Sequence, residues 1–143
     1  MANKEAFIEA INKGYTFKGE SVKLGAAMLD GEVVAEAGIN LPLKTLNRHG
    51  LIAGATGTGK TKTLQVLAEG LSDASIPVVL MDIKGDLSGI AAAGITNSKI
   101  EERIKLIGGE YKPAGFPVEL MTLSDDKKGV RLRATVSEFG PIL

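Results

Sequence analysis

The chain has 143 residues, which is enough for one domain with a hydrophobic core but too few for two full domains. Its 17 basic and 17 acidic residues give no net charge, so the total carries no electrostatic indication of nucleic-acid binding, although a local patch or an oligomeric pore is compatible with it. The absence of cysteine and the single histidine exclude disulfide scaffolds, thiolate metal sites and histidine-based metal clusters.

Targeting and membrane segments are not apparent in the sequence. The N-terminus lacks the basic region and apolar core of a signal peptide, and no apolar run approaches the roughly 18 residues that span a bilayer. We therefore expect a cytoplasmic protein without a membrane segment.

Residues 1–20 are predicted to form an N-terminal helix and a connector. Apolar residues recur at helical spacing over residues 3–13, with Asn3 as a candidate cap and Gly14 as a stop signal. Residues 21–37 are predicted to form a β-hairpin, because two strand-like runs flank Asp30-Gly31, which is a strong turn signal. Residues 39–46 are expected to be an extended lead-in to the segment that follows.

That segment, residues 54–61, fits the phosphate-loop pattern G-x-x-x-x-G-K-[ST] without a departure. Its three glycines lack a Cβ, so the backbone is free to take positive φ, to approach a ligand and to turn successive N–H groups toward an anion. Lys60, the candidate catalytic residue, is expected to bind the β- and γ-phosphates, and the Thr61 hydroxyl is expected to ligate Mg²⁺. The candidate nucleotide-binding residues are Gly54, Ala55, Thr56, Gly57, Thr58, Gly59, Lys60 and Thr61.

The flanking sequence has the strand–loop–helix order that this pattern requires. Residues 51–53 are a short apolar run typical of a buried parallel strand. After the loop, apolar residues recur at helical spacing, with Gln65 and Glu69 on the opposite face and Gly70 near the expected end of the helix. Residues 78–81 form a second apolar run, which would close a β–α–β crossover. An α/β fold with a parallel sheet is therefore predicted.

Beyond the crossover the sequence predicts one helix and two strands. The helix is expected to be capped by Asn97 or Ser98 and to run through Ile107, with isoleucines along one face. Residues 117–123 and 130–136 are strand candidates separated by a charged turn.

Hydrolysis of a bound nucleotide needs an acid near Mg²⁺, and two aspartates are candidates. Asp82 directly follows the apolar run, so it would emerge at the carboxyl edge of a parallel sheet, where ligands bind. It would either line the Mg²⁺ site or cap the turn at Lys84-Gly85. Asp125 lies in the charged turn, where a solvated turn residue is the better interpretation.

The single histidine and one basic cluster complete the candidates. His49 lies just before the apolar run at 51–53, where a structural role is more typical than a catalytic one. The basic cluster is compatible with DNA contact, but a solvated strand face is the better interpretation. Its members are Lys127, Lys128, Arg131 and Arg133.

The stretch NRHGLIAGATGTGKTKTLQVLAEGLSDASIPVVLMDIKGDLSGIAAAG resembles the nucleotide-binding segment of the bacterial HerA-like ATPases, which belong to the HerA–FtsK group of ring-forming DNA translocases and helicases. Within it, DIKGD at residues 82–86 is similar to the D-P-K-G-[DE] element of that group and of conjugative coupling proteins, with Ile83 where proline is common. The closing RATVSEFGPIL also resembles the interior of such a protein. The resemblance extends over residues 21–143 and is most specific across 47–94.

The resemblance implies a P-loop NTPase with a RecA-like, mostly parallel sheet that assembles as a hexamer with ATP sites between subunits. Because proteins of the group are several times longer, residues 21–143 would be the truncated N-terminal part of the ATPase domain. Its sheet would be incomplete, and the Walker B acids and arginine finger would lie beyond Leu143. The implied function is ATP binding with Mg²⁺ and, in the full-length protein, ATP hydrolysis coupled to DNA translocation or unwinding. DNA as a partner rests on the resemblance alone.

A second hypothesis is a nucleotide-dependent switch or binding module without motor activity. The neutral charge and the missing downstream acids favour it for the chain as it stands. A small-molecule kinase is a weaker third hypothesis, because no arginine-rich lid segment is visible.

Overall fold

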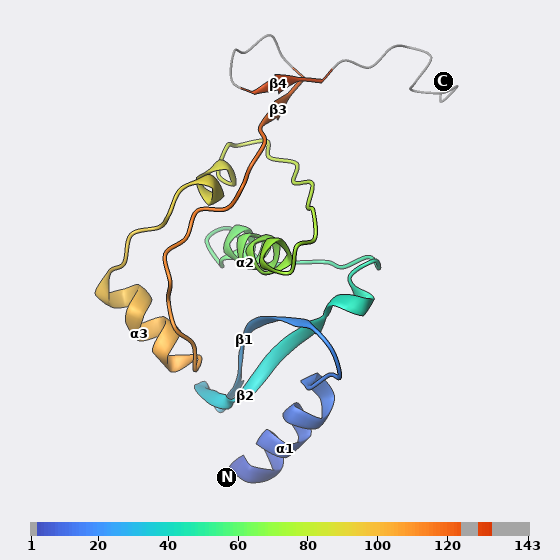
Figure 1. Cartoon of the computed structure of the whole chain (residues 1–143). Helices are drawn as coiled ribbons and strands as arrows, with labels where there is room; N and C mark the ends of the chain where they lie inside the picture. The colour runs from blue at the N-terminus through green and yellow to red at the C-terminus, as the bar shows by residue number, and fades with distance from the viewer. Residues whose placement is uncertain (1–2, 124–128, 133–143) are drawn as a thin grey trace.

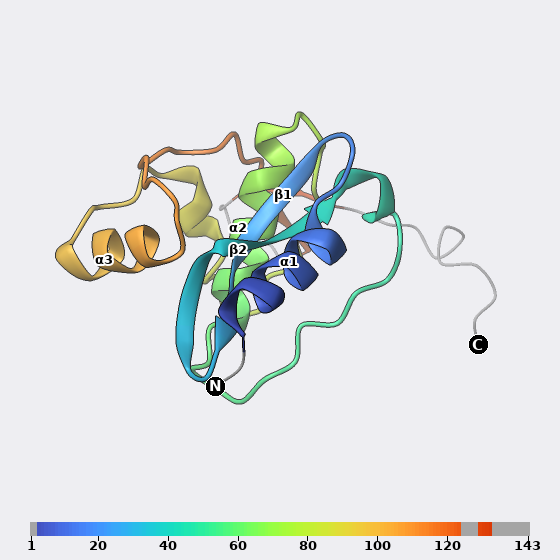
Figure 2. The ribbon, with the colours of Figure 1, turned by 90° about the horizontal axis from the view of Figure 1, so that it is seen from below.

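The computed structural model describes residues 3–123 and 129–132. The fold is α/β, as predicted, and it is built around an antiparallel hairpin of β1 (Ser21–Leu29) and β2 (Glu32–Pro42). Figure 1 shows the helix α1 (Lys4–Tyr15) on one side of this hairpin and the helix α2 (Lys60–Asp73) on the other. Figure 2, seen from below, shows the same order, with α1 lying across the hairpin.

The helix α1 begins where the sequence predicts. The Asn3 side-chain oxygen accepts hydrogen bonds from the backbone N–H groups of Glu5 (3.0 Å) and Ala6 (3.4 Å), which satisfies donors that have no partner within the helix. The helix ends at Tyr15, whose carbonyl accepts a hydrogen bond of 3.1 Å from the Asn40 side chain. That bond joins the end of α1 to β2.

The hairpin is confirmed, and it is longer than expected. Asp30 (φ 51°) and Gly31 (φ 86°) both take positive φ, as the tight turn that matches the twist of two strands requires. The second strand runs to Pro42, so it includes part of the predicted lead-in. Ala26 pairs with Gly38 but Ala27 pairs with Val34, so the intervening residues of β2 form a bulge.

The helix α2 packs on β1 at very close range. A Cβ added to Gly70 would lie 2.5 Å from a Val22 methyl carbon, so the missing side chain is what allows the approach. Gly70 lies inside the helix, which ends at Asp73. Ser75, two residues further on, takes φ 60° and turns the chain away from the helix. The buried apolar residues are few within the described part of the chain: Val22, Val34, Ala37, Ala68 and Leu87.

A third helix, α3 (Ser98–Leu106), is capped by Asn97, whose side-chain oxygen accepts a hydrogen bond of 3.0 Å from the Ile100 N–H. It ends at Leu106, and Gly108, two residues further on, takes φ 66°. The Lys23 ammonium donates to the carbonyls of Ile107 (3.1 Å) and Gly108 (2.9 Å). A cation is favourable at a helix C-terminus, so this contact fixes α3 to the hairpin.

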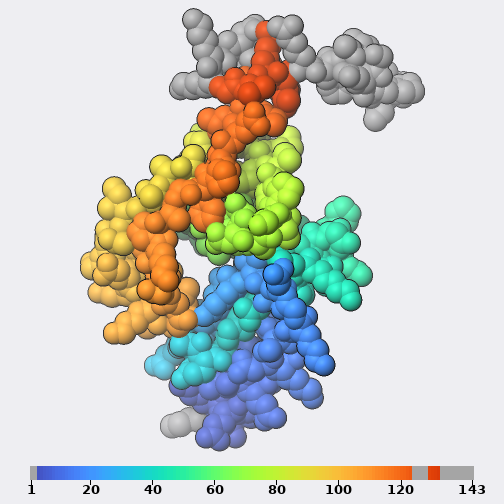
Figure 3. Space-filling view, in the orientation of Figure 1, coloured from blue at the N-terminus to red at the C-terminus, as the bar shows by residue number. Residues whose placement is uncertain are grey.

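The remaining elements are short. They are the 3₁₀ helices η1 (Leu43–Thr45) and η2 (Ser88–Ala91) and the parallel pair β3 (Met121–Thr122) and β4 (Val130–Arg131). The strands expected at 117–123 and 130–136 are thus observed only in part, and residues 133–136 lie outside the described residues. Figure 3 shows the chain after α3 running along the surface past α2 toward β3.

The parallel β–α–β crossover expected around α2 is not formed in the described part of the chain. Residues 51–53 and 78–81 carry no strand, and Leu51 and Val79 are 89% and 91% exposed. A strand exists only where a neighbouring strand accepts and donates its backbone hydrogen bonds, and no described segment pairs with either run. Both runs have the apolar composition of buried strands, but composition alone does not supply a pairing partner.

Candidate functional site

The phosphate-loop segment leads directly into α2. Gly57 (φ 81°) and Gly59 (φ 96°) take the left-handed conformation, as the pattern predicts, and Gly59 is the residue from which the helix starts. Gly54 does not take positive φ, and its missing side chain serves a different purpose. A Cβ there would lie 2.6 Å from the Thr58 hydroxyl oxygen, so Gly54 makes room for Thr58 within the loop.

The Ala55 carbonyl oxygen accepts hydrogen bonds from three donors of the loop. The Lys60 ammonium donates to it at 2.7 Å, the Thr58 hydroxyl at 2.8 Å and the Thr58 backbone N–H at 3.4 Å. Lys60, which the sequence assigns to the phosphates, is therefore held on the backbone of its own loop. A phosphate oxygen is a charged acceptor and would compete with the Ala55 carbonyl for the ammonium.

Thr61 and Asp82 border the same hollow, which has a volume of about 260 Å³. Thr61 is contributed by the first turn of α2 and Asp82 by the segment after the apolar run at 78–81, so the structure brings together two residues that the sequence assigns to one site. The other residues around the hollow are Leu64, Met81, Ile83, Lys84, Asp86 and Leu87.

Asp82 organises the backbone of the DIKGD element. Its carboxylate accepts hydrogen bonds from the N–H groups of Lys84 (3.1 Å), Gly85 (2.8 Å) and Leu87 (2.8 Å). These donors, Leu87 first, favour the charged form and lower the pKa of Asp82 below its ordinary value. The turn-capping role considered for Asp82 is therefore observed, and the carboxylate that performs it also lines the hollow shared with Thr61.

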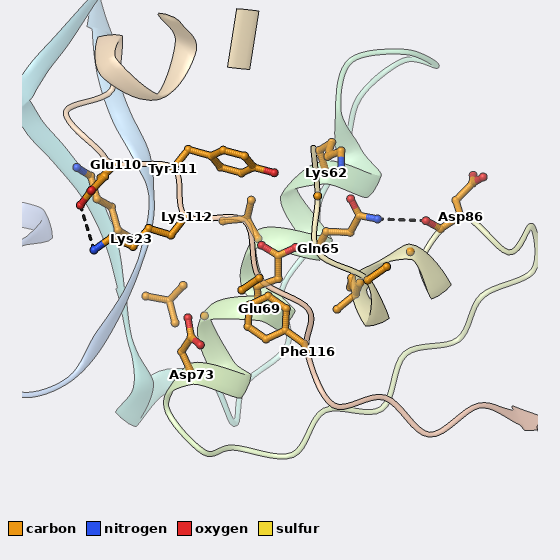
Figure 4. Close-up of a pocket in the computed structure, with 18 of the residues that line it drawn as sticks. Lys23, Lys62, Gln65, Glu69, Asp73, Asp86, Glu110, Tyr111, Lys112 and Phe116 are labelled. Atoms are coloured by element: carbon orange, nitrogen blue, oxygen red, sulfur yellow. Dashed lines mark hydrogen bonds and ion pairs between the residues drawn. The ribbon is translucent and has the colours of Figure 1, made fainter. Parts of the chain in front are cut away.

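A second hollow of about 720 Å³ lies along another face of α2 (Figure 4). Figure 4 shows Lys62, Gln65, Glu69 and Asp73 along α2, together with Tyr111 and Phe116 from the segment that passes this helix. η2 and β1 contribute further lining residues, among them Ile90 and Val22.

The sequence places Gln65 and Glu69 on the face of α2 opposite its apolar residues, and in the structure this polar face borders the second hollow and is partly buried. Gln65 is only 8% exposed; its Nε2 donates to the Asp86 carbonyl at 3.1 Å, while its buried Oε1 has no hydrogen-bond partner. Glu69 is half-buried, and burial raises the pKa of its carboxyl group, with nearby Lys62 opposing the rise. Segments far along the chain cover this face of α2, and local periodicity carries no information about them.

The other candidate residues are not brought to the loop in the described structure. His49 is exposed in the irregular chain between η1 and the loop. Arg131 is exposed in β4. The remaining candidates lie outside the described residues: Asp125, Lys127, Lys128 and Arg133. Across 3–123 and 129–132, no group of three or more His, Asp or Glu side chains is arranged to hold a metal ion.

The roles of the Ala55 carbonyl and the Thr58 hydroxyl were not predicted from the sequence. A backbone carbonyl has no signature in the sequence, because its direction depends on the conformation of the whole loop. The one available signal was a hydroxyl residue directly before Gly59 and Lys60.

A family model described as helicase HerA-like C-terminal matches residues 28–143, which include β2, the phosphate loop and everything that follows them. A search of curated proteins and a search of solved structures gave no match. None of the described helices is long and apolar enough to cross a membrane.

Proposed function

The chain belongs to the helicase HerA-like C-terminal family, and on that premise we propose that its phosphate loop binds ATP together with Mg²⁺. In the full-length protein, ATP hydrolysis would be coupled to translocation on DNA or to its unwinding. The proposal includes a P-loop NTPase domain with a RecA-like parallel sheet, in which the apolar runs at 51–53 and 78–81 would be strands.

One observation carries the nucleotide-binding proposal. The loop has left-handed glycines at Gly57 and Gly59, it opens directly into the 14-residue helix α2, and the Thr61 side chain there shares a hollow with a carboxylate. Left-handed glycines let a backbone close around phosphate, and the helix N-terminus adds favourable partial charge. The chemistry of these groups therefore fits a nucleotide with its metal ion.

The proposed roles follow from the chemistry of each group. The backbone from Gly54 to Thr61 would surround the phosphates with N–H donors. Lys60 would leave the Ala55 carbonyl, bind the β- and γ-phosphates and stabilise the charge that develops during transfer. Thr61 would hold Mg²⁺, which keeps most of its other ligands as water and phosphate oxygens, and Asp82 would line this site. The bound Mg²⁺ would neutralise phosphate charge.

The test is ATP binding by the full chain, measured by isothermal titration calorimetry in the presence of Mg²⁺. Lys60→Ala is expected to weaken binding at least tenfold, because a charge-assisted contact is lost. Lys62→Ala is the matched control, since this exposed lysine lies two residues further on and outside the loop pattern. Undiminished affinity in Lys60→Ala would show that the loop does not bind nucleotide through this residue.

The DNA and oligomer parts of the proposal rest on the family. A translocase of this kind would form hexamers in the presence of ATP, and duplex DNA would stimulate its ATPase activity at low salt, where phosphate contacts are strongest. Failure of duplex DNA to stimulate the intact protein under these conditions would remove DNA as the partner.

One observation favours the second candidate, a nucleotide-dependent switch or binding module without motor activity. Both oxygens of Asp82 already accept hydrogen bonds from Lys84, Gly85 and Leu87, so this acid is committed to its own turn. Such a protein would bind ATP without turnover and would stay monomeric. Sedimentation with and without ATP, combined with a phosphate-release assay, separates the two candidates.

A further inference from the structure

The Thr58 hydroxyl and the Lys60 ammonium share one acceptor, the Ala55 carbonyl oxygen, at 2.8 Å and 2.7 Å. The Thr58 N–H approaches the same oxygen at 3.4 Å. A carbonyl oxygen has two lone pairs, so three donors compete for two good positions. Each donor is consequently held less strongly than it would be alone.

The loop is built around this arrangement. Gly54 has no room for a Cβ, because one would lie 2.6 Å from the Thr58 hydroxyl oxygen. Gly57 takes φ 81°, which lets the chain turn back so that Thr58 reaches the carbonyl three residues before it. Two glycines of the pattern therefore serve the Thr58 contact.

We propose that Thr58 is a positioning residue that controls how readily Lys60 leaves the Ala55 carbonyl for a triphosphate. While the Lys60 ammonium donates to the Ala55 carbonyl, the Thr58 hydroxyl competes for the same oxygen and weakens the Lys60 hydrogen bond. When Lys60 moves to a phosphate, the same hydroxyl stays hydrogen-bonded to the Ala55 oxygen, so the turn from Ala55 to Thr58 keeps its contact. The inference rests on the proposed function for its ligand, but the contact it concerns exists without nucleotide.

Loss of the Thr58 hydroxyl has a different effect on Lys60 under this proposal than it would have if the hydroxyl only stabilised the loop. Without the hydroxyl, Lys60 becomes the main partner of Ala55 and is held more firmly. A loop that merely lost a structural hydrogen bond would instead become looser and would expose Lys60 more. The two cases therefore predict opposite changes in the reactivity of the Lys60 amine.

The experiment compares Thr58→Val with the wild-type chain in two measurements. The first is the rate of Lys60 acetylation by acetic anhydride without nucleotide, followed by peptide mass spectrometry, with exposed Lys62 as the internal reference. The second is the dissociation constant for Mg-ATP. One neutral hydrogen bond corresponds to a change of about three- to tenfold, so Thr58→Val is expected to slow acetylation and to weaken ATP binding by that factor.

Two further variants are the controls. Thr58→Ser keeps the hydroxyl and is expected to restore both values to those of the wild type. Thr63→Val removes another hydroxyl, which donates to the Gly59 carbonyl at 3.2 Å and does not contact Ala55, and is expected to change neither value.

Faster or unchanged Lys60 acetylation in Thr58→Val would overturn the inference. So would an effect that Thr58→Ser does not reverse. If the wild-type chain binds no ATP, the proposed function fails, and so does the proposal that Lys60 moves from the Ala55 carbonyl to a triphosphate. The acetylation rates would still decide whether Thr58 controls how strongly Lys60 is bound to the Ala55 carbonyl.

Discussion

The close contact between Gly70 of α2 and Val22 of β1 gives the sharpest test of how the helix is held on the hairpin. A Cβ at Gly70 would lie 2.5 Å from Val22 Cγ1 and 3.2 Å from Cγ2, and Val22 itself is buried. Gly70→Ala should improve helix propensity by about 1 kcal/mol, but forcing a methyl group into an occupied space costs about 1–3 kcal/mol. We therefore expect a net loss of stability of about 1 kcal/mol.

A compensating variant makes this argument quantitative. Val22→Ala removes both methyl carbons and leaves the Val22 Cβ at 3.4 Å from the new methyl group, which is an ordinary contact distance. Val22→Ala alone should cost about 1–3 kcal/mol through lost burial. The double variant should be more stable than the sum of the two single changes by about 1–3 kcal/mol, because the collision no longer exists.

The assay is urea denaturation followed by far-UV circular dichroism on all four proteins. Gly14→Ala is the matched control, since this glycine also lies in a helix, α1, but has no atom within 4 Å of the added Cβ. It should stabilise the chain by up to about 1 kcal/mol. The close packing of Gly70 against Val22 would be refuted if Gly70→Ala stabilises the chain as much as Gly14→Ala does. It would also be refuted if the effects of Gly70→Ala and Val22→Ala simply add in the double variant.

Three other expected outcomes concern backbone conformation and charge. Ser75→Gly should stabilise the chain by about 1 kcal/mol in urea denaturation, because Ser75 holds φ 60°, which is costly for a residue with a side chain. Gly108→Ala should destabilise it by about 1–2 kcal/mol, since Gly108 takes φ 66° and the new Cβ would lie 3.3 Å from the Ala35 carbonyl oxygen; unchanged stability would contradict that geometry. The lowered pKa of Asp82 means that its stabilisation is complete above the unfolded-state pKa of about 4 and is lost as the pH falls through the lower folded-state pKa. The wild-type chain should therefore exceed Asp82→Asn in urea midpoint at pH 7 and approach it below pH 4, and a gap independent of pH would refute this role.

Several features of this protein follow from the sequence alone because their causes are local. Asn3 and Asn97 cap helices through side chains that reach N–H groups two or three residues away. Asp30-Gly31 forms its turn because these residues tolerate positive φ. The phosphate-loop pattern likewise identified Gly57 and Gly59 as left-handed and marked the start of α2. The resemblance carried by residues 47–94 agrees with the family to which the chain belongs.

Tertiary structure decided the features that depend on segments distant in the sequence. Gln65 is buried because residues near Asp86 and Tyr111 cover that face of α2, and helical periodicity records only which residues share a face. Gly70 lies within its helix rather than at its end, and its missing side chain makes room for Val22, 48 positions earlier (70 − 22). The runs at 51–53 and 78–81 have the composition of strands but no described pairing partner, and hydrogen bonding between strands requires one. The position of Lys60 on the Ala55 carbonyl likewise depends on the three-dimensional path of the loop, which places a backbone oxygen and two side-chain donors together.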